Sequence, residues 1–264
     1  MNIHVFFNDG QRILFERYFA PSLKDDLRVI VHPIRNLGQD QNFGTQGFKE
    51  IIHQKIDTLI NDIFPHEEHS YGFILSDIDI QFFKPCAPIV RDYLERHDIV
   101  FQREEPHTST VNTGFVAMRA TPDVINFWAQ IESELEDALD SPQFVNEQSL
   151  ANSLLMKTPQ LNWSVFPDEI WAWSNRRFFP TIVHLPDICL HHANCTQPRG
   201  NKTSLDLKIE QLDLVNKVVQ SRTRHLIFMV FDFICRGWMR IVRVLPKNVR
   251  KKTGSPIKRL SVRS

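Results

Sequence analysis

The chain has 264 residues, of which 42% are hydrophobic and 23% charged. This length and composition fit a globular protein with one large α/β domain or two small ones. The formal net charge is zero, but residues 222–264 carry +11 and residues 1–221 carry −11. That asymmetry indicates a basic tail whose partner is an anionic surface. Four scattered cysteines exclude a disulfide framework.

The start of the chain predicts a strand and not a targeting segment. Residues 3–7 form a short apolar run that leads into a turn, without the charged and long apolar regions of a secretory signal. No stretch reaches the ~18 apolar residues that a spanning helix needs. We therefore expect a reducing, cytoplasmic location.

Strand and helix patterns alternate along the first third of the chain. Residues 11–19 favour a helix that ends near Pro21, and residues 27–32 favour a second strand. Residues 48–64 place isoleucine and leucine at the spacing of an amphipathic helix. The run Phe73–Leu75 is wholly apolar, as expected for a parallel strand that is covered on both faces.

The later residues continue this alternation. Thr121, Pro122 and Asp123 supply a cap, a first-position proline and a first-turn acid, so a helix is expected to begin there. A second helix is expected from Asn146. Further strands are expected at residues 99–102, 114–118, 163–166 and 181–185. The whole pattern predicts an α/β fold with a mainly parallel sheet.

Two carboxylates follow the apolar strand at residues 73–75. Asp77 and Asp79 are expected to project side by side, with Ile78 pointing the opposite way. The carboxyl end of a central strand is where open α/β sheets bind ligands. Neighbouring carboxylates repel unless a cation or proton holds them, and oxygen ligands suit Mg²⁺ or Mn²⁺. The alternative is a polar strand end that only caps a turn.

These residues resemble a known family. The segment Ser76–Phe83 is similar to the DxD motif of GT-A-type glycosyltransferases. Asn112–Phe115, Asn146–Gln148 and His191–Asn194 then follow in the order seen in nucleotide-diphospho-sugar transferases. The resemblance covers roughly residues 1–205. It implies a GT-A-like, Rossmann-type sheet flanked by helices, and transfer of a sugar from a nucleotide-diphosphate donor to a hydroxyl acceptor.

The resemblance also implies roles for individual residues, with Mn²⁺ or Mg²⁺ as cofactor. The implied metal ligands are Asp77, Asp79 and His192, and the implied donor-binding residues are Lys55, Asp77, Asn112, Gly114, Gln148 and Lys202. The family often has an aromatic residue after His-Ala-Asn, where this chain has Cys195–Gln197. The lysine that contacts the diphosphate is therefore Lys202, Lys208 or neither.

Several of these positions have a purely structural alternative. Lys55 could be a solvated helix lysine, Asn112 and Gly114 a turn, and Asn146 only a helix cap. The segment 184–195 holds histidines and cysteines, but their spacing does not match a common zinc site. Tryptophans could line an acceptor pocket or pack in the core; they are Trp163, Trp171 and Trp173. The general base is left open among Asp168, Glu169 and Asp187.

The end of the chain is basic and amphipathic, so we divide the chain into a transferase domain, 1–220, and a C-terminal segment, 221–264. Residues 225–263 combine apolar residues, a tryptophan and a cationic run. This pattern predicts a C-terminal basic amphipathic helix that lies on an anionic membrane surface. The alternative is a helix that docks on the domain before a basic tail. No nucleic-acid partner is expected.

A membrane position suggests a lipid-linked or surface glycan as acceptor, and a cytoplasmic protein held peripherally on the inner face of a membrane. Two other functions are kept as alternatives. One is a catalytically silent, membrane-associated scaffold with the same fold. The other is a sugar nucleotidyltransferase, although the first strand lacks the glycine-rich, basic phosphate loop that this chemistry needs.

Overall fold

The structure is a computed structural model. It describes residues 1–35, 44–104, 109–139, 144–174, 188–194, 197–198 and 200–220, except the side chains of residues 171–174. The predicted strand at 181–185 and the C-terminal segment at 221–264 lie outside these residues.

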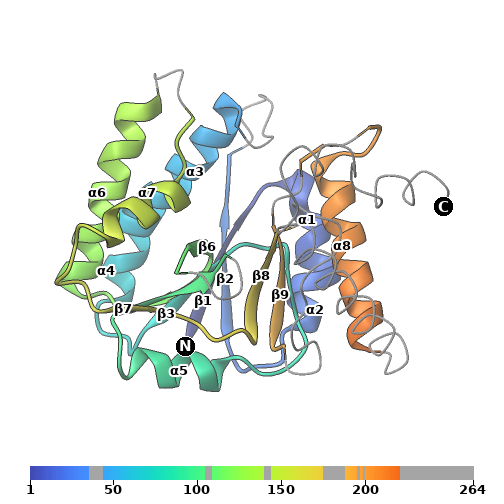
Figure 1. Cartoon of the computed structure of the whole chain (residues 1–264), viewed down its shortest axis with the longest axis horizontal. Coiled ribbons are helices and arrows are strands. Elements are labelled where there is room, and N and C mark those ends of the chain that lie inside the picture. The colour runs from blue at the N-terminus through green and yellow to red at the C-terminus, as the bar shows by residue number, and fades with distance from the viewer. Residues whose placement is uncertain are drawn as a thin grey trace, which may run out of the picture.

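The described residues form a nine-stranded sheet with helices on both sides (Figure 1). The strands are β1 (Asn2–Phe7), β2 (Arg28–Pro33), β3 (Phe73–Ser76), β4 (Ile80–Phe82), β5 (Ile99–Arg103), β6 (Val111–Met118), β7 (Trp163–Val165), β8 (Ile170–Ser174) and β9 (Leu190–Asn194). The strand order is β2-β1-β3-β6-β5-β8-β9-β4, and β7 pairs with β5.

The strand pairing is mainly parallel, as the sequence predicts. β1 pairs in parallel with β2 and β3, and β8 pairs in parallel with β5 and β9. β6 is antiparallel to both β3 and β5, and β4 is antiparallel to β9. The mainly parallel α/β fold is therefore confirmed.

Helices cover the two faces of this sheet. The helical segments are η1 (Asp9–Gln11), α1 (Arg12–Leu14), η2 (Phe15–Phe19), α2 (Ala20–Ser22), α3 (Gln46–Thr58), η3 (Leu59–Ile63), α4 (Phe64–Glu67), α5 (Ala87–Leu94), α6 (Pro122–Leu139), α7 (Glu147–Leu155) and α8 (Ser204–Val219). In Figure 1, α3, α6 and α7 lie to one side of the sheet, and α1, α2 and α8 to the other. Among the described residues, no helix combines the length and hydropathy that crossing a bilayer requires.

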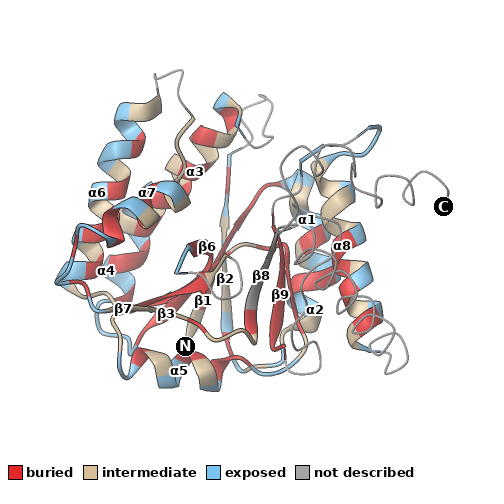
Figure 2. Cartoon of the chain, viewed as in Figure 1, coloured by how far each residue is buried: buried red, intermediate tan, exposed pale blue. Residues whose placement is uncertain are grey.

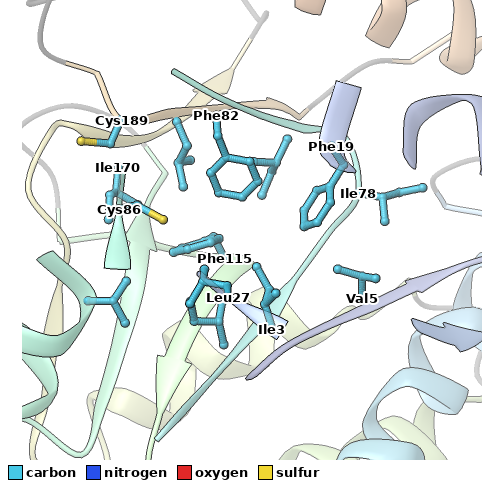
Figure 3. Packing of buried hydrophobic residues seen from close by; sticks show 14 of the residues in the cluster. Ile3, Val5, Phe19, Leu27, Ile78, Phe82, Cys86, Phe115, Ile170 and Cys189 are labelled. Carbon is cyan, nitrogen blue, oxygen red and sulfur yellow. The ribbon is translucent and has the colours of Figure 1, made fainter. Parts of the chain in front are cut away.

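Two hydrophobic clusters, one on each face, hold the sheet in place. Ile3, Val5 and Ile74 belong to the cluster that Figure 3 shows, together with Phe19 and Phe82. Phe73 and Leu75 point the other way and pack with α3, α6 and α7. The central strands are consequently buried along their whole length (Figure 2). This explains why Phe73–Leu75 is continuously apolar instead of alternating.

One segment differs from the sequence-based expectation. The sequence predicts an extended chain that carries Asp77 and Asp79 side by side, but the chain bends there, between β3 and β4. β4 leaves the neighbourhood of β3 and pairs with β9 at the far end of the sheet order. The bend lets β9 approach the end of β3, which a straight strand would not allow.

Candidate active site

The bend between β3 and β4 is fixed by backbone hydrogen bonds on both sides. The Asp77 amide donates to the Gly114 carbonyl of β6 at 2.7 Å, and the Ala193 amide of β9 donates to the Asp79 carbonyl at 2.8 Å. Ile78 points into the hydrophobic core (Figure 3), as the sequence predicts. The two carboxylates are thus held where β3, β6 and β9 meet.

His192 completes a three-residue cluster with these carboxylates. One potential ligand atom from each of Asp77, Asp79 and His192 lies within 4.8 Å of the others. His192 Nε2 is 3.3 Å from Asp79 Oδ1 and 3.7 Å from Asp77 Oδ2. Carboxylate oxygens and an imidazole nitrogen are common ligands of divalent metal ions. The chemistry of the residues therefore fits a divalent cation.

Two lysines pair with the carboxylates of this cluster. Lys55 Nζ, on α3, donates to Asp77 Oδ1 at 2.8 Å. Lys208 Nζ, on α8, donates to Asp79 and also to the Ala193 carbonyl, at 3.3 Å. Burial opposes ionisation of Asp79, but Lys208 and His192 together hold the pKa of this carboxyl well below its ordinary value. The Asp79 carboxylate is charged and paired.

Lys55 is a buried lysine that stays charged. Its side chain is 7% exposed, so the alternative of a solvated helix lysine is wrong. Burial would lower the pKa of Lys55, but Asp77 and Glu147 outweigh burial and raise it. Glu147 itself has a raised pKa because it is buried beside Asp77, although Lys55 partly offsets this. The amino end of α7 therefore adds a third carboxyl to the charge balance around Asp77.

Gly114 leaves the space that the His192 ring uses. A Cβ atom at position 114 would lie 2.1 Å from His192 Cε1 and 2.7 Å from its Nδ1, far inside van der Waals contact. The backbone amide of Gly114 donates to Asn112 Oδ1 at 2.8 Å. Gly114 is thus more than a turn residue, because any side chain there displaces the imidazole.

A polar network extends from Asn112 along the same edge. Asn112 Nδ2 donates to Glu104 Oε2 at 2.5 Å and to Gln148 Oε1 at 3.0 Å. Asn194 Nδ2 donates to the same Glu104 oxygen at 3.2 Å. Thr113 Oγ1 donates to Glu147 Oε1 at 3.3 Å. These amide and carboxylate groups are the kind that recognise hydroxyls.

The other sequence-predicted residues lie as follows. Lys202 is exposed and pairs with Glu210, so it does not join the cluster, whereas Lys208 does. Asn146 caps α7 by accepting from the Ser149 amide at 2.8 Å. Asp168 pairs with Arg103 at 3.4 Å. Trp163 packs against the hydrophobic core. Glu169 is half-buried, and its backbone carbonyl accepts from the Cys189 amide at 2.7 Å. Five other candidates for a base, a zinc ligand or an acceptor contact lie outside the described side chains: Trp171, Trp173, His184, Asp187 and Cys195.

Two residues of the site are missed by the sequence analysis, Gln102 and Glu104. Both lie at the carboxyl end of the short strand β5, directly after the apolar residues Ile99–Phe101. Polar side chains that follow a buried strand are the same signal that marks Asp77. That signal could have found them.

Two solved structures of other proteins share this fold at low sequence identity. The fold is similar to that of a glycosyltransferase involved in the glycosylation of the major capsid of PBCV-1, with a TM-score of 0.51. The two sequences are 14% identical, and the alignment covers 80% of this chain and 98% of that one. It is also similar to the galactosyltransferase LgtC in complex with donor and acceptor sugar analogs, with 10% identity, a TM-score of 0.50, and coverage of 82% and 96%. At these identities the likeness shows the fold alone, and no curated protein sequence matches the chain.

The sequence itself matches a family over most of the described residues. The model of the nucleotide-diphospho-sugar transferases covers residues 22–213, which include β3, the Asp77–Asp79 bend, β9 and most of α8. The match favours sugar transfer over the sugar nucleotidyltransferase alternative. The chain belongs to the nucleotide-diphospho-sugar transferase family, and it is a nucleotide-sugar-dependent glycosyltransferase with a GT-A-like fold.

Proposed function

We propose that this protein moves a sugar from a nucleotide-diphosphate donor to a hydroxyl acceptor in a reaction that depends on Mn²⁺ or Mg²⁺. The observation that carries the proposal is the Asp77, Asp79 and His192 cluster with a lysine on each carboxylate. When bound there, a divalent cation supplies Lewis-acid stabilisation of the charge that develops on the diphosphate leaving group.

The two lysines have different roles in this proposal. Lys55 is buried and orients the Asp77 carboxylate through an ion pair of 2.8 Å. Lys208 lies on α8, with its side chain 23% exposed, and contacts both Asp79 and a backbone carbonyl. A donor diphosphate can therefore replace Asp79 as the ion-pair partner of the Lys208 ammonium, and no helix or strand has to unfold. That exchange keeps charge balanced as the donor arrives.

Asn112, Gln148 and Glu104 are proposed to contact the hydroxyls of the donor sugar. Their mutual hydrogen bonds hold them in place, and the amide groups of Asn112 and Gln148 retain acceptor or donor capacity beyond the bonds described. Such fixed polar groups favour a sugar whose hydroxyls can replace those bonds, and a sugar that lacks one hydroxyl leaves a buried partner unsatisfied.

The first test is calorimetric titration of the full chain with UDP and GDP, in Mn²⁺ and in EDTA. We expect one nucleotide to bind in Mn²⁺ and to lose most of its affinity in EDTA. Equal affinity in Mn²⁺ and in EDTA would contradict the metal dependence. Failure of both nucleotides to bind would contradict the choice of these two donor bases.

The acceptor is proposed to be a lipid-linked or surface glycan, presented on the inner face of a membrane. The support is the charge of residues 222–264 and their apolar, tryptophan-bearing pattern. The full chain is expected to cosediment with vesicles of anionic lipid, and a chain cut after Ser221 is not. Equal sedimentation of the two proteins would contradict this part of the proposal.

A further inference from the structure

A hollow with a volume of about 460 Å³ lies at the amino ends of β1 and β3, between the turn that follows α4 and helix α5. In Figure 1, α5 lies beside the amino terminus of the chain. None of the residues that line the hollow belongs to the active site described above. We propose that this hollow binds a neutral oligosaccharide, with the ring of Tyr71 stacked on one face of a sugar. Such a site acts independently of the proposed metal and donor sites.

Tyr71 is the exposed aromatic residue of this hollow. It is 53% exposed, whereas every other phenylalanine, tyrosine and tryptophan whose side chain the structure describes is buried or half-buried. A tyrosine ring has an apolar face and a polar hydroxyl at its edge. The C–H groups on one side of a pyranose also form an apolar face, and its hydroxyls point outward around the ring. Stacking of the two faces removes apolar surface of both partners from water.

The position of Tyr71 is fixed by its neighbours. Its hydroxyl donates to the Arg91 carbonyl of α5 at 3.4 Å. The next residue, Gly72, has a φ of +150°, and a Cβ atom there would lie 2.7 Å from Leu94 Cδ1. Only glycine lets the chain pass this close to α5 in that backbone conformation. A ring that is already held in place loses less conformational freedom when a ligand binds.

Two side chains of opposite charge line the hollow together with this ring. Arg91 and Glu95 are one helical turn apart at the end of α5, and both are exposed. The ion pair between Arg91 and Asp26 is long, at 3.4 Å, and open to water, so the guanidinium can bind a further partner. A guanidinium only donates and a carboxylate only accepts, whereas a sugar hydroxyl does both. Two neighbouring hydroxyls can therefore bond to both side chains at once.

The charges around the hollow favour a neutral sugar over a ligand that carries phosphate. Glu67 also lines the hollow, so two carboxylates face one guanidinium there. Carboxylates repel a phosphate but accept hydrogen bonds from sugar hydroxyls. The Glu67 carboxylate already accepts a hydrogen bond from Asn2 at 2.5 Å, which leaves Glu95 as the main acceptor for a ligand. The volume of about 460 Å³ lies within the usual range of small-ligand sites.

The hollow and the active site lie at opposite ends of β3. Gly72 comes directly before this strand and Asp77 directly after it. At ~3.3 Å per residue, these two residues are roughly 16 Å apart along the sheet. An oligosaccharide in the hollow therefore leaves the Asp77, Asp79 and His192 cluster free to bind its own ligands.

The first test is saturation-transfer difference NMR on the full chain in EDTA, with maltotriose, lactose and N,N′-diacetylchitobiose as separate probes. We expect transfer to at least one of them, strongest at the ring protons on one face of a sugar. EDTA and the omission of nucleotide keep the donor site out of the measurement. No transfer to any of the three probes would overturn the proposal.

Variants then locate the binding. Tyr71→Ala removes the ring and should weaken binding of the probe at least about tenfold, whereas Tyr71→Phe keeps the ring and should retain most of the affinity. Glu95→Ala should weaken binding about three- to tenfold, the usual effect of one lost hydrogen bond. Met156→Ala is the matched control, because Met156 is 83% exposed at the end of α7 and does not line the hollow.

The outcomes separate this site from the proposed function. Unchanged transfer in Tyr71→Ala, or equal losses in Tyr71→Ala and Tyr71→Phe, would overturn the stacking role of the ring. Tyr71→Ala should bind nucleotide in Mn²⁺ as the wild type does, and a loss there would mean that the hollow is not independent of the donor site. Failure of the wild type to bind UDP or GDP would count against the proposed function and would leave the sugar result unaffected.

Discussion

Two clusters of buried polar and charged groups lie in the same sheet and are built differently. The active-site cluster consists of Asp77, Asp79 and His192 with Lys55 and Lys208. A second group, which we call the amino-edge cluster, consists of Asn2, His4, His32 and Glu67. In it, His4 Nε2 lies 3.0 Å from Glu67 Oε1, His4 Nδ1 lies 2.9 Å from His32 Nε2, and Asn2 Nδ2 donates to Glu67 at 2.5 Å.

The two clusters differ in charge and in exposure, and from this we infer that one stabilises the fold and the other binds a ligand. The amino-edge cluster holds one carboxylate among neutral partners, and the Glu67 and His4 side chains are 3% and 4% exposed. The active-site cluster holds two carboxylates and two ammonium groups, and the Asp77 side chain is 39% exposed. A closed, fully bonded network contributes to stability, whereas an open one whose cations can exchange partners is suited to a charged ligand. Four predictions test this contrast.

The largest effect is expected at Asp79. Asp79→Asn keeps the size of the side chain but removes the charge that a cation needs, so Mn²⁺-dependent nucleotide binding should weaken at least about 100-fold. Isothermal calorimetry with the nucleotide that the wild type binds measures this. Asp213→Asn is the control, because Asp213 is also on α8 but pairs with Arg17 and Tyr18. An affinity loss of less than about fivefold would mean that the cation binds at another site.

The amino-edge cluster should show the opposite response. Glu67→Leu leaves the half-buried Asn2 amide and the buried His4 imidazole without their acceptor, which should lower the free energy of unfolding by about 2–3 kcal/mol. Urea denaturation measures that loss, and nucleotide affinity should not change. Glu67→Gln keeps one acceptor oxygen and should lose less. A large fall in affinity with unchanged stability would contradict the division between the clusters.

A smaller effect on binding is expected from Gly114→Ala. The added methyl group would meet the His192 ring, so the ring must move and Mn²⁺ affinity should fall about tenfold. The protein should remain folded, with a loss of about 1–3 kcal/mol in the free energy of unfolding. Gly10→Ala is the matched control, since its nearest neighbour would be the Asn8 side chain at 3.2 Å. Unchanged Mn²⁺ affinity in Gly114→Ala would show that the ring position does not matter.

The smallest effect concerns pH and the amino-edge cluster. Burial lowers the pKa of His4 below its ordinary 6.5 and also lowers that of His32. Below pH 6.5 the unfolded chain therefore binds protons that the folded chain does not, and stability falls as the pH falls. The pKa of Glu67 is lowered as well, because burial is outweighed by its hydrogen bonds from Asn2, Ser70 and His4, so its stabilisation is present above pH 4.5 and is lost at lower pH.

The measurement is the free energy of unfolding by urea between pH 7.5 and pH 5.5. Wild type should lose more stability over this range than His4→Gln, with a difference of about 1 kcal/mol, since one pKa unit corresponds to ~1.4 kcal/mol. Equal losses would mean that His4 is not held neutral in the folded protein. Other buried histidines, such as His191, affect both proteins alike.

Much of the fold is readable from local sequence signals. The apolar run at β3, the helical spacing of α3 and the caps of α6 and α7 all predict elements that the structure contains. The sequence analysis overlooked α8, although this helix begins at a capping box formed by Thr203 and Asp206. Two other missed elements lack such local signals: α5 has no side-chain cap, and β9 is a histidine-bearing segment without an apolar run. Their formation depends on packing against the sheet, which local pattern does not encode.

The sequence by itself determined the family, the α/β class and the chemistry of the candidate metal site at Asp77, Asp79 and His192, because these depend on residue identity and order. Only the tertiary structure decided which charges meet. Lys208 reaches Asp79 across 129 positions of the chain, while Lys202, nearer to the histidine motif, pairs with Glu210. Gln102 reaches His192 across 90 positions through a shift in strand register. Such contacts follow from strand order and bulges, which are properties of the assembled sheet and not of any local segment.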